Sequence, residues 1–242
     1  GRDNLGGTWD LFRYPGIRSD SDMYTLSYGF KPWDSEELIP SGESILNYIK
    51  EAVKEHNIED HIRTHHKVCQ AEWEDRDKIW KVTVENHTSF YCKFLYMCGG
   101  YYRYDKGYEP AFKNSDLFKG PFIHAQNWRN DIEVQEKSIV VIGSGATAVT
   151  LVPELTKKAK NVTMLQRSPT YIASWPGQDW LANILRKFFP PRFVSFIMKA
   201  KYNLFQQFIY YLAQKSPETA KKILLSRLRK EVGPNIDVEK HF

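Results

Sequence analysis

The stretch that decides the fold is Ser138-Ile139-Val140-Val141-Ile142-Gly143-Ser144-Gly145-Ala146-Thr147-Ala148. Its almost wholly apolar start predicts a short strand, buried on both faces as in a parallel sheet. The G-x-G-x-x-A that follows predicts a tight turn at Gly143, close approach of the Gly145 backbone to a pyrophosphate, and a helix over 147–158. A second strand is predicted over 161–165. This order of elements is typical of an α/β dinucleotide-binding fold.

The residues after the second strand indicate which dinucleotide is bound. An NAD site places an acidic residue there, whereas this chain has Gln166, Arg167 and Ser168. An arginine at this position pairs with a 2′-phosphate, which favours NADP over NAD. The alternative is a glycine-rich turn that binds nothing.

The rest of the chain continues the alternation of strands and helices and ends in a helical appendage. A helix is predicted over 44–55 with Ser44 as its N-cap, and residues 178–229 are predicted helical, with a break at Pro190-Pro191. Strand-like segments are predicted at 66–73, 79–85 and 89–98. An ordered functional loop is predicted at 6–35.

Composition excludes several classes of protein. The chain is 42% hydrophobic and 26% charged, as in folded globular proteins, and its net charge of +5 is too small to indicate nucleic-acid binding. Cys69, Cys92 and Cys98 form no C-x-x-C pair, which excludes a disulfide framework and a cysteine-rich zinc site. His65-His66 has no partner at metal-ligand spacing, so no metal site is expected.

The sequence also bears on location. It contains no transmembrane run and no signal peptide, so we expect a cytoplasmic protein. The aromatic helices at 180–212 are predicted to form core and the wall of a tunnel. The alternative is contact with a membrane surface, because basic residues flank these helices. Those residues are Lys187, Arg192, Lys199 and Lys201.

Two further segments carry a resemblance to a known family. Phe118-Lys119-Gly120-Pro121-Phe122-Ile123-His124-Ala125-Gln126-Asn127-Trp128 resembles the F-x-G-x-x-x-H-x-x-x-W fingerprint of Baeyer–Villiger monooxygenases. Gly6-Gly7-Thr8-Trp9 with Arg13-Tyr14-Pro15-Gly16-Ile17-Arg18-Ser19-Asp20 resembles their flavin-facing segment. The resemblance extends over nearly the whole chain and is closest to the ethionamide-monooxygenase-like branch.

The resemblance implies a flavoprotein with two Rossmann-like dinucleotide-binding domains, one for FAD and one for NADPH, and a helical insert in the second. The implied activity is NADPH-dependent insertion of one oxygen atom of O2 next to a ketone carbonyl, with sulfur-containing substrates as a further class. The implied domains are a partial FAD domain, a fingerprint linker, the first part of the NADP domain and the insert. Their bounds are 1–115, 116–136, 137–176 and 177–242.

The resemblance also implies roles for individual residues. Those along FAD would be Thr8, Trp9, Asp10 and Leu11, with the backbone of Val68 at the adenine. The flavin–nicotinamide junction would hold Arg18, Ser19 and Asp20, with Asp20 catalytic. The NADP pyrophosphate turn would be Gly143, Ser144, Gly145, Ala146, Thr147, Ala148 and Val149, with Arg167 and Ser168 at the 2′-phosphate. The fingerprint residues are Phe118, Gly120, His124 and Trp128, and His124 and Trp128 would act in the linker between domains.

The chain departs from the family pattern at three places. The motif for the FAD pyrophosphate would precede Gly1, and the family's active-site arginine would follow Phe242. Arg129 stands where the family usually has Pro or Asp. We therefore expect a fragment of a longer protein that is inactive alone. Two alternatives stay open: an inactive NADP-binding module, and another two-domain flavin oxidoreductase, of which the disulfide-reductase type would need a cysteine pair.

Overall fold

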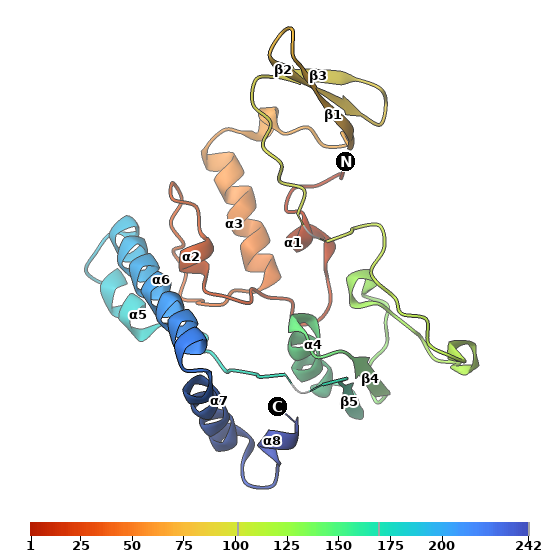
Figure 1. The fold of residues 1–242 in the computed structure, drawn as a ribbon, viewed down its shortest axis with the longest axis vertical. Helices are drawn as coiled ribbons and strands as arrows, with labels where there is room; N and C mark the ends of the chain where they lie inside the picture. Colours follow the sequence, from red (N-terminus) through yellow and green to blue (C-terminus); the bar gives the residue numbers. More distant parts are fainter. Residues whose placement is uncertain (101, 169, 242) are drawn as a thin grey trace. The chain divides into compact units, whose positions relative to one another are not determined.

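The computed structural model describes residues 1–100, 102–168 and 170–241 (Figure 1). The chain forms two compact units, each built from two stretches of sequence. The first unit comprises residues 1–13 and 43–129. The second comprises residues 14–42 and the chain from residue 130 onward.

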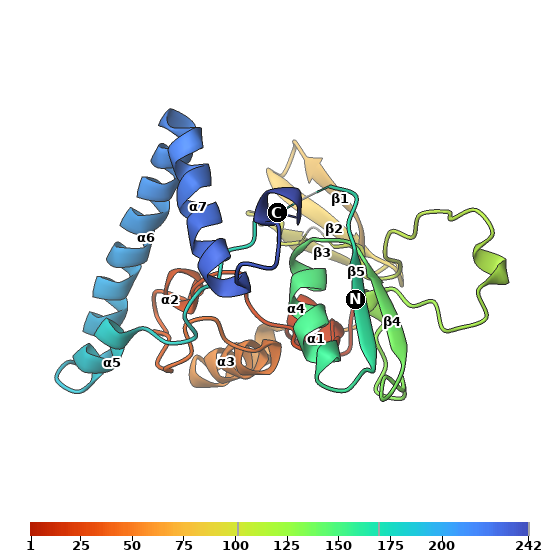
Figure 2. The ribbon, with the colours of Figure 1, turned by 90° about the horizontal axis from the view of Figure 1, so that it is seen from below.

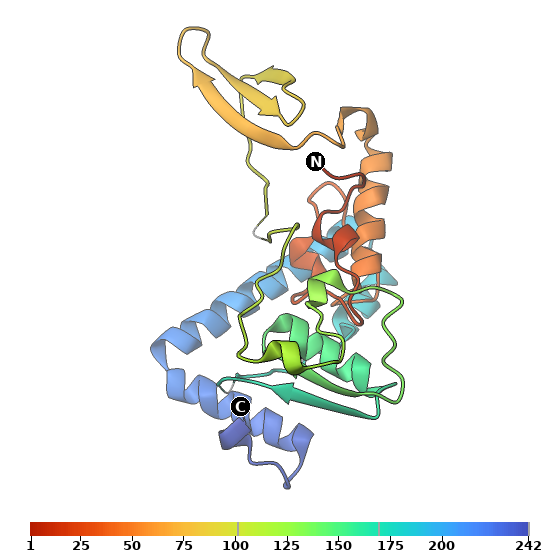
Figure 3. The same cartoon turned by 90° about the vertical axis from the view of Figure 1, so that its right-hand side faces the viewer.

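The first unit contains one long helix and an antiparallel three-stranded sheet in the order β1-β2-β3 (Figure 3). Tryptophans pair across its first two strands, Trp73 opposite Trp80, and Val82 lies opposite Phe90 on the third. The helices and strands are α1 (Thr8–Leu11), α3 (Gly42–Glu55), β1 (Val68–Glu74), β2 (Ile79–Val84) and β3 (Ser89–Cys92), with 3₁₀ turns η1 (Glu59–His61), η2 (Ser115–Leu117) and η3 (Ala125–Asn127).

Two predictions for this unit were wrong in their bounds. The long helix begins at Gly42, so Ser44 lies inside its first turn and is not the N-cap. The third strand ends at Cys92 rather than at Cys98. Phe94 and Tyr96 are each 90% exposed, because none of the described strands pairs with the chain there.

The second unit contains the predicted strand, turn, helix and strand. β4 (Ser138–Ile142) and β5 (Asn161–Leu165) pair in parallel, with Ser138 opposite Asn161 and Ile142 opposite Leu165. The connecting helix α4 (Ala146–Thr156) packs against the pair (Figure 2). The remaining helices are α2 (Met23–Leu26), α5 (Trp180–Arg186), α6 (Pro191–Lys215), α7 (Pro217–Val232) and α8 (Val238–His241).

Two burial predictions for this unit were wrong. Val140 and Ile142 of β4 are 60% and 51% exposed, since β4 pairs only with β5 among the described strands. The aromatic helices at 180–212 were expected to form core and the wall of a tunnel, yet Leu204, Phe205, Phe208 and Ile209 of α6 are all exposed. The break at Pro190-Pro191 is confirmed, because Pro191 begins α6. None of the described helices is long and apolar enough to cross a membrane.

Candidate functional site

The turn between β4 and α4 is held by main-chain atoms. Gly143 has a φ of 132°, which only glycine adopts without strain, and its N–H donates to the Leu165 carbonyl at 2.9 Å. Gly145 is the N-cap of α4 and offers no side chain to the free N–H groups of the first turn, which also carries no acidic residue. The positive end of the helix dipole is therefore available to an anion.

Gly145 is not required by the packing of the chain itself. Its φ of −78° suits any residue, and a methyl group placed on its Cα would have no atom within 4 Å. The space beside Gly145 is therefore open, and a side chain at this position would fill it. A glycine in this setting fits the close approach of a phosphate to the backbone.

Arg167 and Ser168 lie beside this turn. Leu165, the last residue of β5, lies two positions before Arg167, and its carbonyl accepts from the Gly143 N–H. Thr170, two positions after Ser168, hydrogen bonds through its hydroxyl to the Ser144 hydroxyl at 3.0 Å. Arg167 is exposed. The structure thus brings the predicted pyrophosphate turn and the predicted 2′-phosphate pair together at one end of the parallel strands.

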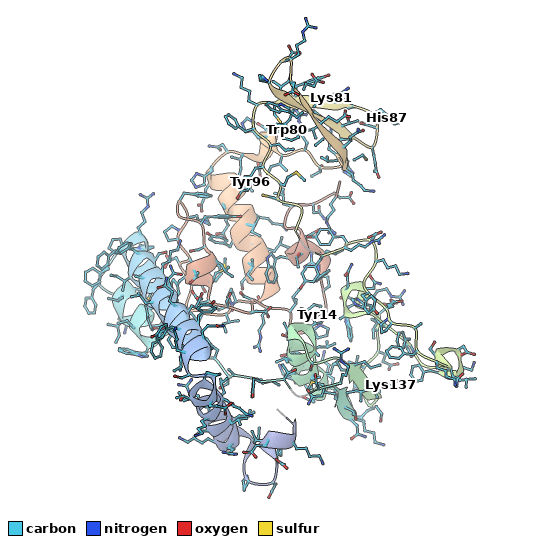
Figure 4. The ribbon with its side chains drawn as sticks, in the orientation of Figure 1. Tyr14, Trp80, Lys81, His87, Tyr96 and Lys137 are labelled. Carbon is cyan, nitrogen blue, oxygen red and sulfur yellow. The ribbon has the colours of Figure 1, made fainter. Side chains whose placement is uncertain are left out.

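The loop that begins at Tyr14 packs onto α4 (Figure 4). The Tyr14 hydroxyl hydrogen bonds with Thr147, in the first turn of that helix. A methyl group on Gly16, whose φ is 75°, would lie 2.5 Å from Glu154 and 3.0 Å from the Thr150 carbonyl. Burial raises the pKa of the Tyr14 hydroxyl, the bond with Thr147 lowers it, and the charge of Asp20 raises it further.

Asp20 stands exposed between anchored neighbours. The Ser19 N–H donates to the Pro40 carbonyl at 3.0 Å, and the Ser19 hydroxyl donates to the Ser21 carbonyl at 2.7 Å. Arg18 pairs with Ser41 across an isolated β-bridge. This backbone framework fixes the position of Asp20 and leaves its carboxylate open.

Asp22, two residues further on, has a different role. It is buried and caps α2, accepting from the Thr25 N–H at 2.8 Å and the Thr25 hydroxyl at 2.9 Å. Gln206 of α6 donates to its other oxygen at 3.3 Å. Of the two carboxylates, only Asp20 is free for chemistry.

Residues 8–11 form α1 in the first unit. The Thr8 hydroxyl bonds to the Tyr104 hydroxyl at 3.1 Å, while Asp10 accepts from Arg2 at 2.7 Å and from Arg13 at 3.4 Å. Trp9 and Leu11 are half-buried in the same helix. The Asp10 carboxylate is thus already paired, and its side chain serves the fold of this segment.

Val68 lies at the first position of β1 and is exposed. The pairing of β1 with β2 shifts register between Val68 and Gln70. Val68 therefore lies at a strand end, beside an irregularity in the ladder.

The fingerprint segment is fixed by contacts within the first unit. A methyl group on Gly107 would lie 2.4 to 2.7 Å from three atoms of the His124 ring, and one on Gly120 would lie 2.6 Å from the Phe118 ring. His124 Nδ1 accepts from the Gln126 N–H at 3.2 Å. Trp128 is half-buried and ends η3. His124 caps a turn here.

Sequence reasoning missed two of these positions. Tyr14 belongs to the Arg13–Asp20 segment, but nothing in that segment indicates contact with Thr147. Gly107 has no local signal at all, because its partner His124 lies seventeen positions further along the chain. In the described part of the chain, no His, Cys, Asp and Glu side chains gather as a metal site.

A family model described as flavin-binding monooxygenase-like matches residues 33–227. The chain belongs to the flavin-binding monooxygenase-like family. It is 48% identical over 245 residues to the FAD-containing monooxygenase EthA of Mycobacterium tuberculosis (strain ATCC 25618 / H37Rv), covering 100% of this chain and 50% of that relative. The chain thus spans about half the length of the curated relatives it matches.

Solved structures of the same kind resemble the fold. A crystal structure of OTEMO in complex with FAD and NADP has a TM-score of 0.59 and 30% identity, over 70% of this chain and 34% of that one. Cyclohexanone-bound cyclohexanone monooxygenase in the Rotated conformation has a TM-score of 0.65 and 22% identity, over 86% of this chain and 39% of that one. The mixed α/β fold of a flavoprotein monooxygenase, predicted from sequence, is confirmed.

Proposed function

We propose that the protein carrying this chain is an NADPH-dependent FAD monooxygenase that inserts one oxygen atom of O2 next to a ketone carbonyl. Thioethers or thioamides would be a second class of substrate, because the oxygen-transfer chemistry that bound FAD supplies also acts on sulfur. Family membership supports the flavin monooxygenase class. The Baeyer–Villiger reaction rests on the fingerprint Phe118–Trp128 and on the solved structures that share the fold.

The proposed architecture has two Rossmann-like dinucleotide-binding domains with a helical insert. Residues 1–115 would be part of the FAD domain and 116–136 the fingerprint linker. Residues 137–176 would begin the NADP domain, and 177–242 would belong to the insert. The parallel β4–α4–β5 unit supports the third assignment, and the run of helices from α5 to α8 supports the fourth.

The observation that carries the proposal is the open space at Gly145. The turn over residues 143–149 would hold the NADPH pyrophosphate through the N–H groups of residues 144–147, at a helix end with no competing side chain. Arg167 and Ser168, placed beside the turn by Leu165 and Thr170, would bind the 2′-phosphate.

The flavin side of the proposal assigns roles to three segments, each taken by itself. Residues 8–11 and the Val68 backbone would lie along FAD, and Arg18, Ser19 and Asp20 would face the flavin–nicotinamide junction. Bound FAD supplies the oxygen-transfer chemistry. Asp20 would hold charge and orientation there, because its carboxylate is exposed and its neighbours are fixed.

His124 would serve positioning rather than proton transfer. Its Nδ1 is occupied as a turn cap, and its ring fills the space beside Gly107. Together with Trp128 it would set the geometry of the linker between the two cofactor domains.

Replacement of Arg167 tests the proposed function. Arg167→Ala should weaken NADPH binding about 10-fold or more and leave NADH binding unchanged, which corresponds to about 1.4 kcal/mol for one charged hydrogen bond. Arg227→Ala removes an equally exposed arginine on α7 and serves as the control. The measurement is the NADPH/NADH ratio of dissociation constants, and an unchanged ratio in Arg167→Ala contradicts the assignment.

A further inference from the structure

The long helix α6 packs one face against its own unit. Tyr202 stacks with Tyr24 of α2, and its hydroxyl donates to Asp179, the N-cap of α5. The residues buried on this face follow helical spacing, at Val194, Ser195, Met198 and Tyr202. A surface helix with one such face normally carries polar side chains on the other.

The opposite face of α6 is also apolar. Its residues recur every three or four positions, together with Ala200, and so form one stripe along the helix. The exposed fractions are 69% at Phe196, 65% at Leu204 and 59% at Phe208. We call Phe193, Phe196, Leu204, Phe208 and Tyr211 the α6 stripe.

The charged residues of α5 and α6 themselves all have the same sign. From Trp180 to Pro217 the sequence contains no Asp or Glu, and its charged residues are Arg186, Lys187, Arg192, Lys199, Lys201 and Lys215. Lys199 donates to the Ser27 carbonyl, and Lys201 pairs with Asp179. Lys187, Arg192 and Lys215 form no salt bridge with another described residue. Lys187 and Arg192 lie near the start of α6, and Lys215 lies at its end.

A second exposed apolar segment lies against α6 within the same unit. Leu26 at the end of α2 is exposed, as are Tyr28 and Phe30 in the loop that follows, and the two rings stack at 4.9 Å. The bond from Lys199 to Ser27, 2.9 Å long, ties this loop to the helix. The apolar surface therefore extends from α6 onto the loop at residues 26–30.

We propose that the α6 stripe, with the loop at 26–30, binds the surface of an anionic phospholipid bilayer. A helix rich in aromatic rings whose own charged residues are all cations suits the interface, where rings enter the headgroup region and cations meet lipid phosphates. Charge complementarity selects this occupant, since a bilayer presents a continuous negative surface. The helix would lie along the surface without crossing it. This inference is independent of the cofactor assignments.

Co-sedimentation with vesicles tests the inference, using the protein that contains this chain. We expect binding to vesicles that contain phosphatidylglycerol, weakened by salt, and little binding to pure phosphatidylcholine. Phe196→Ser combined with Phe208→Ser should reduce binding about 10-fold or more, because each substitution removes a ring from the interface. The matched control is Phe94→Ser, which changes an exposed phenylalanine of the first unit and should bind as the parent does.

A third variant guards against misfolding. Lys187→Gln with Arg192→Gln leaves the stripe intact and should lower binding to anionic vesicles only, with an unchanged melting temperature. Equal binding of parent and stripe variants overturns the inference. It is also overturned if the stripe variants unfold or change oligomeric state, because the stripe is then covered by another part of the protein or by a second copy.

Discussion

The phosphate turn and the fingerprint segment both depend on glycine, but for opposite reasons. At Gly145 a methyl group would meet nothing within 4 Å, whereas at Gly107 it would lie 2.4 Å from the His124 ring. The first glycine leaves space outside the chain, and the second makes space for a side chain of the same unit. The comparison separates a glycine that leaves room for the proposed ligand from a glycine that makes room for internal packing.

The same distinction applies to carboxylates in the second unit. Asp20 is exposed, while Asp179 is buried, caps α5 through the N–H groups of Leu181 and Ala182, and accepts from Lys201 and Tyr202. Burial alone would raise the pKa of Asp179, but the bonds from Lys201 and Tyr202 hold it below its usual value.

The largest expected effect is that of Asp179→Asn, which removes an inward-facing group. Loss of a buried, hydrogen-bonded charge should lower the free energy of unfolding by about 2 to 4 kcal/mol. Because its pKa is lowered on folding, Asp179 stabilises the fold above about pH 4, and this contribution is lost as pH falls further. Urea unfolding at several pH values measures it, with the exposed Asp77→Asn as control. A variant as stable as the parent near pH 7 contradicts the structural role.

Gly145→Ala tests the outward-facing side of the comparison. A methyl group in the open space should obstruct a pyrophosphate and weaken NADPH binding about 30-fold, or about 2 kcal/mol. Stability should change by only about 0.5 kcal/mol or less, because no atom of the chain is displaced. Calorimetric titration and thermal unfolding give the two numbers. Full NADPH affinity in this variant would remove the basis of the comparison.

Gly107→Ala should give the reverse pattern. The His124 ring must move to admit the methyl group, which should cost about 1 to 2 kcal/mol of folding free energy. Binding of NADPH to the turn should stay within about twofold of the parent, since Gly107 and the turn lie in different units. The control is Gly29→Ala, where a methyl group meets no atom within 4 Å. Unchanged stability of Gly107→Ala would show that the ring is not confined.

The smallest expected effect is that of Tyr14→Phe. Tyr14 links the loop that carries Asp20 to the first turn of α4 through Thr147. Loss of this bond should lower the free energy of unfolding by about 0.5 to 1.5 kcal/mol. It should weaken NADPH binding less than Gly145→Ala does. Tyr91→Phe, on the exposed side of β3, is the control. Equal losses of NADPH affinity in Tyr14→Phe and Gly145→Ala would place Tyr14 in the binding site itself.

Sequence predicted the local parts of this molecule well. The segment from β4 to β5 was placed almost to the residue, because strand, glycine turn and helix start are encoded by neighbouring positions. Contacts between distant segments had no such signal. Examples are the contacts of Gly107 with His124 and of Asp179 with Tyr202. In neither pair does the sequence around one residue indicate its partner.

The exposure of apolar residues was predicted less well. Periodicity located the apolar positions of α6 but not which of its two faces another element covers, so exposed residues such as Phe208 fell within the helices assigned to core and tunnel wall. For the same reason Val140 was expected to be buried in a larger sheet. A residue's spacing is a local property, whereas its burial depends on what lies opposite.

We propose above that the turn after β4 holds the NADPH pyrophosphate. Amide hydrogen exchange with and without NADP⁺ tests it most directly, since the N–H groups of residues 144–147 are the proposed donors. We predict slowed exchange at these residues with NADP⁺, a smaller effect with NAD⁺ at equal concentration, and no slowing in Gly145→Ala. Saturating NADP⁺ that leaves exchange at 144–147 unchanged would contradict the claim.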